Sequence, residues 1–201
     1  MRETWNRLEA WLQANTPWIY ERLGPPATEE ELRAAEAAMG WTLPEEFKAS
    51  YRIHNGHIAD HLWRKGRGAF WGIRPSGFLY DAEDFKRLDL IIDDWRGLHR
   101  SRFPIVMEFP CNVEGPIKPE SEYRSKIPIA SAANLTYYLD MDPAEGGQVG
   151  QVIRYTYDDV RAIYVAPSYG SWLTMMAHLL ESKVYVYCPR HECIVSAKLA
   201  Y

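Results

Sequence analysis

TEEELRAAEAAMGWTLPEEFKASYRIHNG, residues 28–56, encodes two consecutive helices and marks where the first one begins and ends. Thr28 can accept a hydrogen bond from the backbone N–H of Glu31 while the Glu31 side chain accepts one from the backbone N–H of Thr28, which is a capping box. Gly40 suits the left-handed residue that ends a helix. The apolar residues between these ends recur every three or four positions, as expected for one buried helical face: Leu32, Ala35 and Met39.

A second helix is predicted after a short apolar connector. Pro44 suits the first position of a helix, where no backbone N–H is needed, and the two glutamates that follow it favour the positive end of the helix dipole. Phe47 and Tyr51, four residues apart, define its buried face. Because Gly56 and the asparagine before it tolerate left-handed angles, we expect the helix to end there. The loop then holds three polar residues: His54, Asn55 and His57.

The order of these features resembles the Smi/Knr cell-wall-assembly regulator family of the SUKH superfamily. Residues 28–56 resemble the signature of the family, and WNRLEAWLQANTPWIYERLGPPAT (residues 5–28) resembles the Trp-rich helix of its longer, fungal-like members. KIPIASAANLTYYLDMDPAEGGQVGQVI (residues 126–153) resembles its central strands, and APSYGSWLTMMAHLLES (residues 166–182) its closing helix. The resemblance covers residues 5–183 in consistent order. Residues 184–201 form a C-terminal extension outside it.

This resemblance implies a protein that works by binding other proteins. In fungi it implies a regulator that links signalling proteins to cell-wall glucan synthesis, and in bacteria an immunity protein that neutralises a polymorphic toxin. Because no low-complexity tails flank this chain, we favour the bacterial role and keep the cell-wall regulator as the alternative. The net charge of −4 suits a basic toxin such as a nuclease, since complementary charge favours encounter and selectivity.

Two positions depart from the family pattern. Lys126 stands where the family usually has Trp before Ile-Pro-Ile-Ala. Ala132, Ala133 and Asn134 stand where it usually has glycines, so a turn that needs positive φ would depend on Asn134. A ligand that this turn binds in other members therefore does not transfer automatically to this chain.

The composition describes a folded, mildly acidic protein. With 47% hydrophobic and 13% aromatic residues, 201 residues can bury a substantial core, and no linker-like stretch interrupts the expected single domain, residues 1–201. The net charge of −4 argues against general nucleic-acid binding, which needs a concentrated positive field. We find no secretory or membrane-spanning pattern. Three cysteines are too few for a disulfide framework, which favours a cytoplasmic location.

Periodicity places further elements in the order helices, strands, helix. Helical segments are predicted at residues 5–12, 18–23 and 172–181, and a helix that begins at Asp81 and Asp84 with Phe85, Leu88, Ile92 and Trp95 on its buried face. Strands are predicted at residues 69–73, 105–109, 127–130, 135–140, 148–155, 161–166 and 184–187. We therefore expect an α+β fold, with N-terminal helices and a mainly antiparallel sheet that has helices packed on one face.

Two groups of potential metal ligands have better structural interpretations. His54, His57 and His61, with Asp60 nearby, would share a helical face, but Asn55 and Gly56 disrupt that helix. A structural or partner-contacting loop is preferred. Cys188, His191 and Cys193 lie within six residues without the spacing of a zinc site or a second ligand pair. We prefer a turn after a strand, and we predict no metal and no cofactor.

Asp140 and Asp142 carry the competing hypothesis of an enzyme. On a strand, their carboxylates would face the same side, as a hydrolase or a hard cation requires. Pro143 indicates that the strand ends here, so we prefer local roles: Asp140 accepts hydrogen bonds from nearby backbone donors and Asp142 begins a turn. The alternative is a glycan-binding or hydrolytic protein that uses both acids. No nucleophile elbow, phosphate loop or dinucleotide fingerprint is present, and we predict no catalytic residue.

The expected partner is a protein, without direct contact to nucleic acid or membrane. Polar and aromatic residues in or near predicted loops are the candidates for its binding site, since aromatic anchors often dominate an interface. They are His54, Asn55, Trp71, Tyr80, Asp140, Asp142 and Tyr169.

Overall fold

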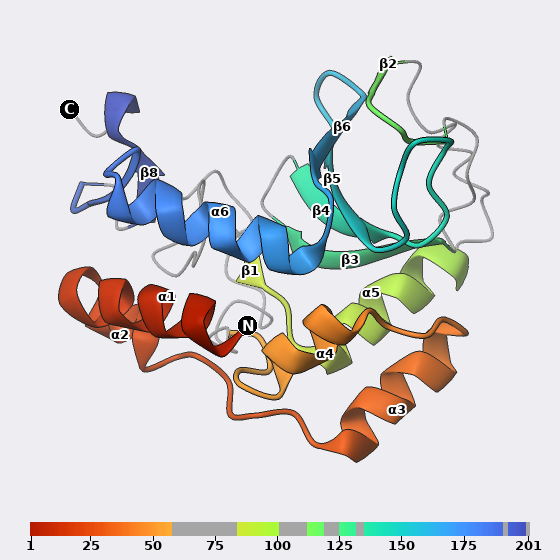
Figure 1. The fold of residues 1–201 in the computed structure, drawn as a ribbon, viewed down its shortest axis with the longest axis horizontal. Helices are drawn as coiled ribbons and strands as arrows, with labels where there is room; N and C mark the ends of the chain where they lie inside the picture. The colour runs from red at the N-terminus through yellow and green to blue at the C-terminus, as the bar shows by residue number, and fades with distance from the viewer. Residues whose placement is uncertain (58–83, 101–111, 119–124, 132–134, 191–192, 200–201) are drawn as a thin grey trace.

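The computed structural model describes residues 1–57, 84–100, 112–118, 125–131, 135–190 and 193–199 of the chain (Figure 1). The helices in these ranges are α1 (Arg2–Asn15), α2 (Pro17–Tyr20), α3 (Glu29–Met39), α4 (Glu45–Tyr51), α5 (Leu88–Arg100), α6 (Tyr169–Glu181) and the 3-10 helix η3 (Ala197–Leu199). The strands are β1 (Asp84–Phe85), β2 (Asn112–Glu114), β3 (Lys126–Ser131), β4 (Leu135–Asp140), β5 (Gln151–Thr156), β6 (Arg161–Ala166), β7 (Tyr185–Cys188) and β8 (Cys193–Ser196).

Six of the strands form one sheet in the order β1-β3-β4-β5-β6-β2. All pairings are antiparallel except the one between β2 and β6, which is parallel. β7 and β8 form a separate hairpin. The predicted α+β class and the mainly antiparallel sheet are confirmed. The predicted bounds of β4 and β6 match, whereas β3 and β5 differ by one to three residues at their ends, as is usual for such boundaries.

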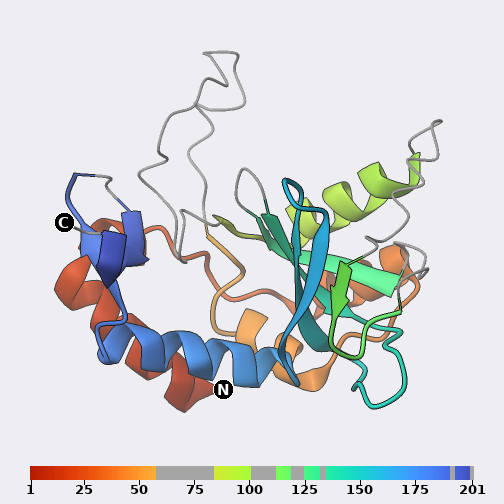
Figure 2. The ribbon, with the colours of Figure 1, turned by 90° about the horizontal axis from the view of Figure 1, so that it is seen from above.

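The six-stranded sheet forms one side of the molecule, and helices pack against one of its faces (Figures 1 and 2). A large hydrophobic cluster joins buried residues of α1, α3, α4, α5 and α6 to the inner face of β3, β4 and β5. Leu139 of β4 belongs to it, whereas its neighbour Tyr138 points to the other face. There Tyr138 packs with Ile117, Ile153 and Tyr155 in a second, smaller cluster. In the described ranges, no helix is long and apolar enough to cross a membrane.

The α3 helix has both predicted ends. The Thr28 Oγ1 accepts from the Glu31 backbone N–H at 3.1 Å, and the Glu31 Oε2 accepts from the Thr28 N–H at 2.7 Å. Gly40 ends the helix with a φ of 72°. The predicted buried stripe is confirmed at Leu32, Ala35 and Met39. Local chemistry therefore sets both ends of this helix, and its buried stripe packs into the large hydrophobic cluster.

Two predicted helix boundaries are wrong. α4 ends at Tyr51, four residues before Asn55, because the following chain turns away and the Asn55 N–H donates to the Pro25 carbonyl at 3.0 Å. Phe85, assigned to a helix from the sequence, is instead in β1 and pairs with Ala130. The helix α5 begins only at Leu88. In both places, contacts between distant segments outweigh the local helical pattern.

The C-terminal strand and turn are confirmed with a small shift. β7 ends at Cys188, which is buried and lies opposite Cys193 of β8 in the strand register of the hairpin. The predicted strands at residues 69–73 and 105–109, the helix start at Asp81 and the turn at Asn134 lie outside the described residues.

Candidate functional site

His54 joins two N-terminal segments instead of standing free in a loop. Its Nε2 lies 2.8 Å from the Glu9 Oε1 on α1, and its Nδ1 lies 3.1 Å from the Gly24 carbonyl oxygen. The ring also packs edge-on against Trp5, with centroids 4.8 Å apart. His54 is only partly exposed, so its contact area for a partner is small.

Asn55 is a structural residue of the same turn. It is buried, and its Oδ1 accepts a hydrogen bond from the Leu88 backbone N–H at 2.9 Å. This bond satisfies a donor at the first turn of α5, which has no partner within its own helix. Burial thus corrects the prediction that Asn55 contacts a partner directly.

His57 completes the turn and is almost fully buried. Its backbone N–H donates to the Phe85 carbonyl at 2.8 Å, and it forms an isolated bridge with Leu23. Among the described residues, neither ring nitrogen has a hydrogen-bond partner. Burial, together with the charge of Arg22, lowers the pKa of His57 to about 4. The imidazole is therefore neutral at pH 7.

Asp140 lies in a buried polar network at one end of the sheet. Lys126 on β3, Asp140 on β4 and Gln151 on β5 are directly opposite one another in register, and all three are fully buried. The Asp140 carboxylate accepts from the Lys126 ammonium, from the Gln151 Nε2 at 3.0 Å and from the Asp142 N–H at 3.1 Å. Burial lowers the pKa of Lys126, and the neighbouring Asp140 acts in the opposite direction.

The network fixes a neighbouring segment as well. The Gln151 Nε2 also donates to the Pro116 carbonyl at 2.9 Å, so the residues after β2 are tied to the end of β5. Asp140 accepts a local backbone donor, as the structural interpretation predicts. Its burial corrects the prediction that it contacts a partner.

Asp142 contributes its backbone N–H to this network, but its side chain lies outside it. Its carboxylate forms an ion pair with Lys118, and both side chains are about half exposed. One acid is thus fully buried against Lys126 and the other is at the surface against Lys118. The two carboxylates do not converge on a shared site, and Asp142 stays a candidate for partner contact.

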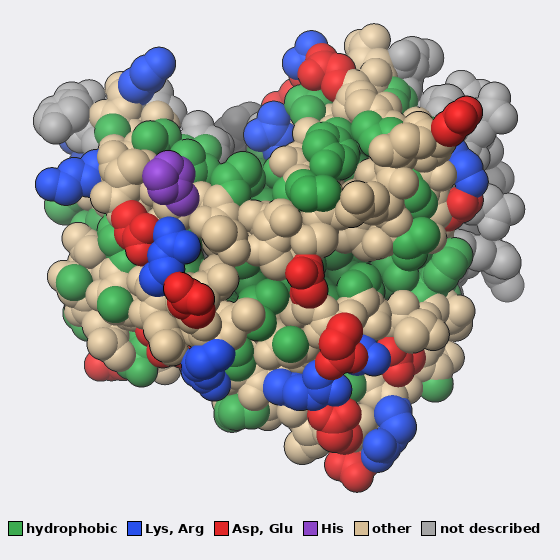
Figure 3. Space-filling model, in the orientation of Figure 1, with side chains coloured by type: hydrophobic (Ala, Val, Ile, Leu, Met, Phe, Trp, Pro, Cys, Tyr) green, Lys and Arg blue, Asp and Glu red, His purple; other side chains and the backbone are tan. Residues whose placement is uncertain are grey.

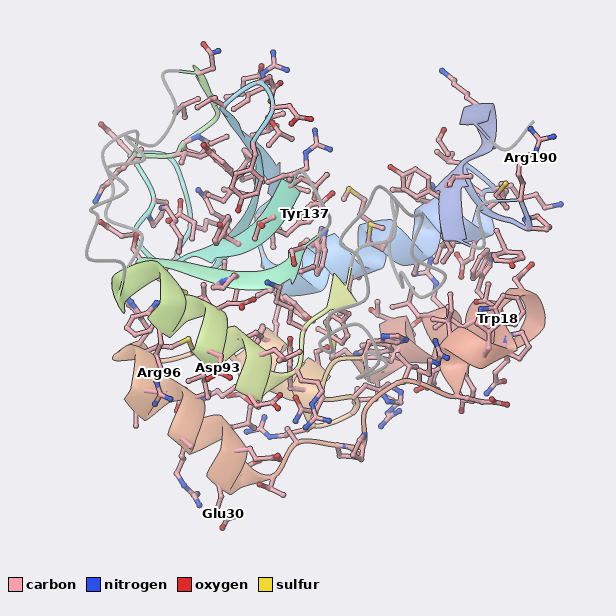
Figure 4. The ribbon with its side chains drawn as sticks, turned by 180° about the vertical axis from the view of Figure 1, so that it is seen from behind. Trp18, Glu30, Asp93, Arg96, Tyr137 and Arg190 are labelled. Carbon is pink, nitrogen blue, oxygen red and sulfur yellow. The ribbon has the colours of Figure 1, made fainter. Side chains whose placement is uncertain are left out.

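Tyr169, a candidate for partner binding that the sequence places in or near a loop, is fully buried at the start of α6. Its hydroxyl accepts a hydrogen bond from the Ser50 Oγ at 3.5 Å, and its ring packs edge-on against Phe47 at 5.0 Å. Burial raises the pKa of Tyr169. Farther along the same interface, Tyr137 of β4 lies between the sheet and α6 and packs against Trp172 at 5.4 Å (Figure 4).

The remaining sequence candidates Trp71 and Tyr80 lie outside the described residues, as do His61 and His191. Within the part of the chain that the structure describes, no three His, Cys, Asp or Glu side chains are grouped as a metal site would require.

An open groove lies where α1, α4 and the first turns of α6 meet. Its volume is about 570 Å³, and Figure 3 shows this face, with acidic side chains over α4 next to the N-terminal end of α6. The lining residues are Met1, Thr4, Glu45, Glu46, Ala49, Gly170, Ser171 and Thr174. The Thr4 and Thr174 hydroxyls lie 3.2 Å apart and connect α1 to α6.

Sequence reasoning missed this groove. The sequence relates Glu46 only to the dipole of its own helix, whereas its Oε2 accepts a hydrogen bond from the Gly170 N–H of α6 at 3.0 Å. A Cβ atom on Gly170 would lie 2.7 Å from that oxygen, so glycine leaves the space that Glu46 occupies. The groove combines residues more than 100 positions apart, and no local pattern signals such a contact.

Comparison with known proteins places these features in a family. The profile of the SMI1 / KNR4 family (SUKH-1) matches residues 26–175. The chain is 24% identical over 196 residues to "Cell wall biosynthesis/cell cycle regulator smi1" of Schizosaccharomyces pombe, which covers 90% of this chain and 36% of that protein. It is 28% identical over 81 residues to "Glucan synthesis regulatory protein" of Neurospora crassa, covering 40% of this chain and 14% of that protein.

A shorter similarity extends to an animal protein. Human "F-box only protein 3" is 39% identical over 56 residues, which is 28% of this chain and 12% of that protein. The similarity therefore spans 36% of the Schizosaccharomyces pombe protein and a smaller share of the other two relatives.

Proposed function

The chain belongs to the SMI1 / KNR4 family (SUKH-1), and from this premise we propose that it is a non-enzymatic module that binds other proteins. The relatives in Schizosaccharomyces pombe and Neurospora crassa are named as regulators. A regulator without chemistry of its own acts through the proteins that it binds. We also propose that residues 1–201 form one domain and that the protein is cytoplasmic.

The commitment of Asp140 to a buried ion pair is the observation that carries this proposal. A hydrolytic pair needs two carboxylates that reach the same substrate, one of them often with a raised pKa. Asp140 is fully buried and its charge is compensated by Lys126, whereas Asp142 is at the surface beside Lys118. Asp140 therefore stabilises the interior of the sheet and Asp142 forms a surface ion pair, so the arrangement of the two acids does not favour a shared reaction site.

The partner belongs to one of two classes. The names of the fungal relatives support a role in regulating cell-wall or glucan synthesis. The immunity role, in which the chain neutralises a basic toxin, has support only from the family resemblance and from the net charge of −4. We therefore favour the regulator role, and the toxin partner stays a prediction.

Affinity purification from the native host, followed by reconstitution from two purified proteins, tests the proposal. We expect a saturable binary complex by calorimetry. If the partner is a toxin encoded beside this chain, cells that express the toxin should stop growing, and co-expression of this chain should restore their growth.

The competing enzyme hypothesis makes a different prediction. The proposal fails if the purified protein binds no protein and instead hydrolyses a sugar or ester substrate, with loss of that activity in Asp142→Asn. Asp142 is the better position for this test, because it is half-exposed and its substitution leaves the buried network intact.

A further inference from the structure

Glu46 stands out among the acids of α3 and α4 because it faces the groove and has no cationic partner among the described residues. Glu29 and Glu45 both pair with Arg52, at 2.6 Å each, and Glu36 pairs with Lys48 at 3.4 Å. Within the described ranges, the only hydrogen bond of the Glu46 carboxylate is the one from the Gly170 N–H. One exposed negative charge of the groove is therefore left to attract a cation from outside.

The position of this carboxylate is fixed in advance. The Gly170 N–H holds one oxygen at 3.0 Å, and the first turn of α6 places its positive end next to it. The second oxygen remains as an acceptor. Because this hydrogen bond restrains the side chain, binding of a ligand costs less conformational entropy at Glu46 than at an unrestrained glutamate.

The rest of the lining matches a long side chain with a compact cationic end. Met1 and Ala49 supply apolar surface for a methylene chain, and the hydroxyls of Thr4, Ser171 and Thr174 have further acceptor capacity. A lysine ammonium is a small point charge with three donors on a flexible four-carbon stem. Arginine gains most from a carboxylate with both oxygens available, and Glu46 offers only one.

We propose that the groove between α1, α4 and α6 receives a lysine side chain of a protein partner, with Glu46 as its counter-ion. This inference rests on the proposed protein-binding function and specifies where part of that binding occurs. The site is distinct from the Asp140 network and from the His54 turn.

A nuclear magnetic resonance titration tests the proposal directly. The probe is the peptide acetyl-Gly-Lys-Gly-Lys-Gly-amide, and the control peptide carries ε-acetylated lysines that lack the charge. We expect saturable shifts of the Gly170, Ser171 and Thr174 amide signals with the lysine peptide at concentrations up to about 10 mM, and none with the control peptide.

Two variants separate the groove from general electrostatics. Glu46→Gln keeps an acceptor for the Gly170 N–H but removes the charge, and it should weaken binding at least about fivefold. Glu30→Gln makes the same change at the outer end of α3, away from the groove (Figure 4), and should leave binding unchanged. Equal binding by the wild type and Glu46→Gln, or an absence of localised shifts, would overturn the proposal.

The outcome is independent of whether a natural partner has been found. If the peptide fails but a purified partner still binds the wild type and Glu46→Gln equally, the groove assignment is wrong and the protein-binding function stands. If the peptide binds in the groove but no protein partner forms a complex, the proposed function fails while the lysine site remains.

Discussion

Val160 adopts a backbone conformation that valine rarely takes. Its φ is 50°, in the turn between β5 and β6, and its side chain is 47% exposed. A β-branched residue is strained in the left-handed region by roughly 1–2 kcal/mol, whereas asparagine tolerates it. We expect Val160→Asn to raise the free energy of unfolding by about 1 kcal/mol, measured by urea denaturation at unchanged slope.

Val184 provides the matched control for this substitution. It is also 47% exposed, but it does not have a positive φ. Val184→Asn should therefore give no gain in stability. If both variants change the unfolding midpoint by the same amount, side-chain polarity rather than backbone strain determines the effect at Val160.

At the scale of elements, the ends of β3, β4 and β5 are held together by Lys126, Asp140 and Gln151. Removing one member of a buried ion pair leaves the other charge without compensation, which costs about 3 kcal/mol or more. We expect this loss for Lys126→Met, measured as the change in unfolding free energy. The double variant Lys126→Met/Asp140→Asn should recover part of it, because neither buried group is then charged. Additive effects of the two single variants would show that the ion pair is not the origin of the loss.

The elements that the sequence predicts well are those specified by neighbouring residues. The cap at Thr28 and the end at Gly40 depend on local hydrogen bonds, and the strands β4 and β6 are short segments between turn-rich stretches. Both kinds of signal are visible in the sequence. The end of α4 and the strand β1 depend on contacts with residue 25 and with β3, so the local helical pattern misleads there.

The candidate site was predictable only in part for the same reason. The sequence predicts the local backbone hydrogen bond of Asp140, but its pairing with Lys126 requires the register of two strands to be known. A lysine in an otherwise apolar strand is the one sequence signal that could have indicated it, since a buried lysine needs a partner. The groove around Glu46 and Gly170 requires the packing of two helices that are distant in sequence.

At the scale of the whole molecule, His57 lies where the N-terminal segment, the exit from α4 and the sheet edge meet. Its backbone forms a β-bridge with Leu23 and donates an N–H to Phe85, and its imidazole is buried without a hydrogen-bond partner in the part of the chain that the structure describes. Local loss of this junction would remove the backbone contacts of His57 with Leu23 and with Phe85 of β1. The protonation state of one residue therefore affects the stability of the assembled fold.

Acid should destabilise the protein through His57. Its pKa is about 4 in the folded state and 6.5 in an unfolded reference chain, so between these values the unfolded state binds a proton that the folded state does not. The contribution of neutral His57 to the free energy of unfolding is complete above pH 6.5 and is lost as the pH falls towards 4. It amounts to at most about 3 kcal/mol.

Carboxylates also titrate in this range, so the test compares variants. His57→Leu should show a weaker fall in unfolding free energy from pH 7 to 4.5 than the wild type, whatever its absolute stability. The exposed His178 is the control, and His178→Gln should retain the wild-type pH dependence. An identical pH dependence in His57→Leu and the wild type would contradict the assignment and place the acid sensitivity in other groups.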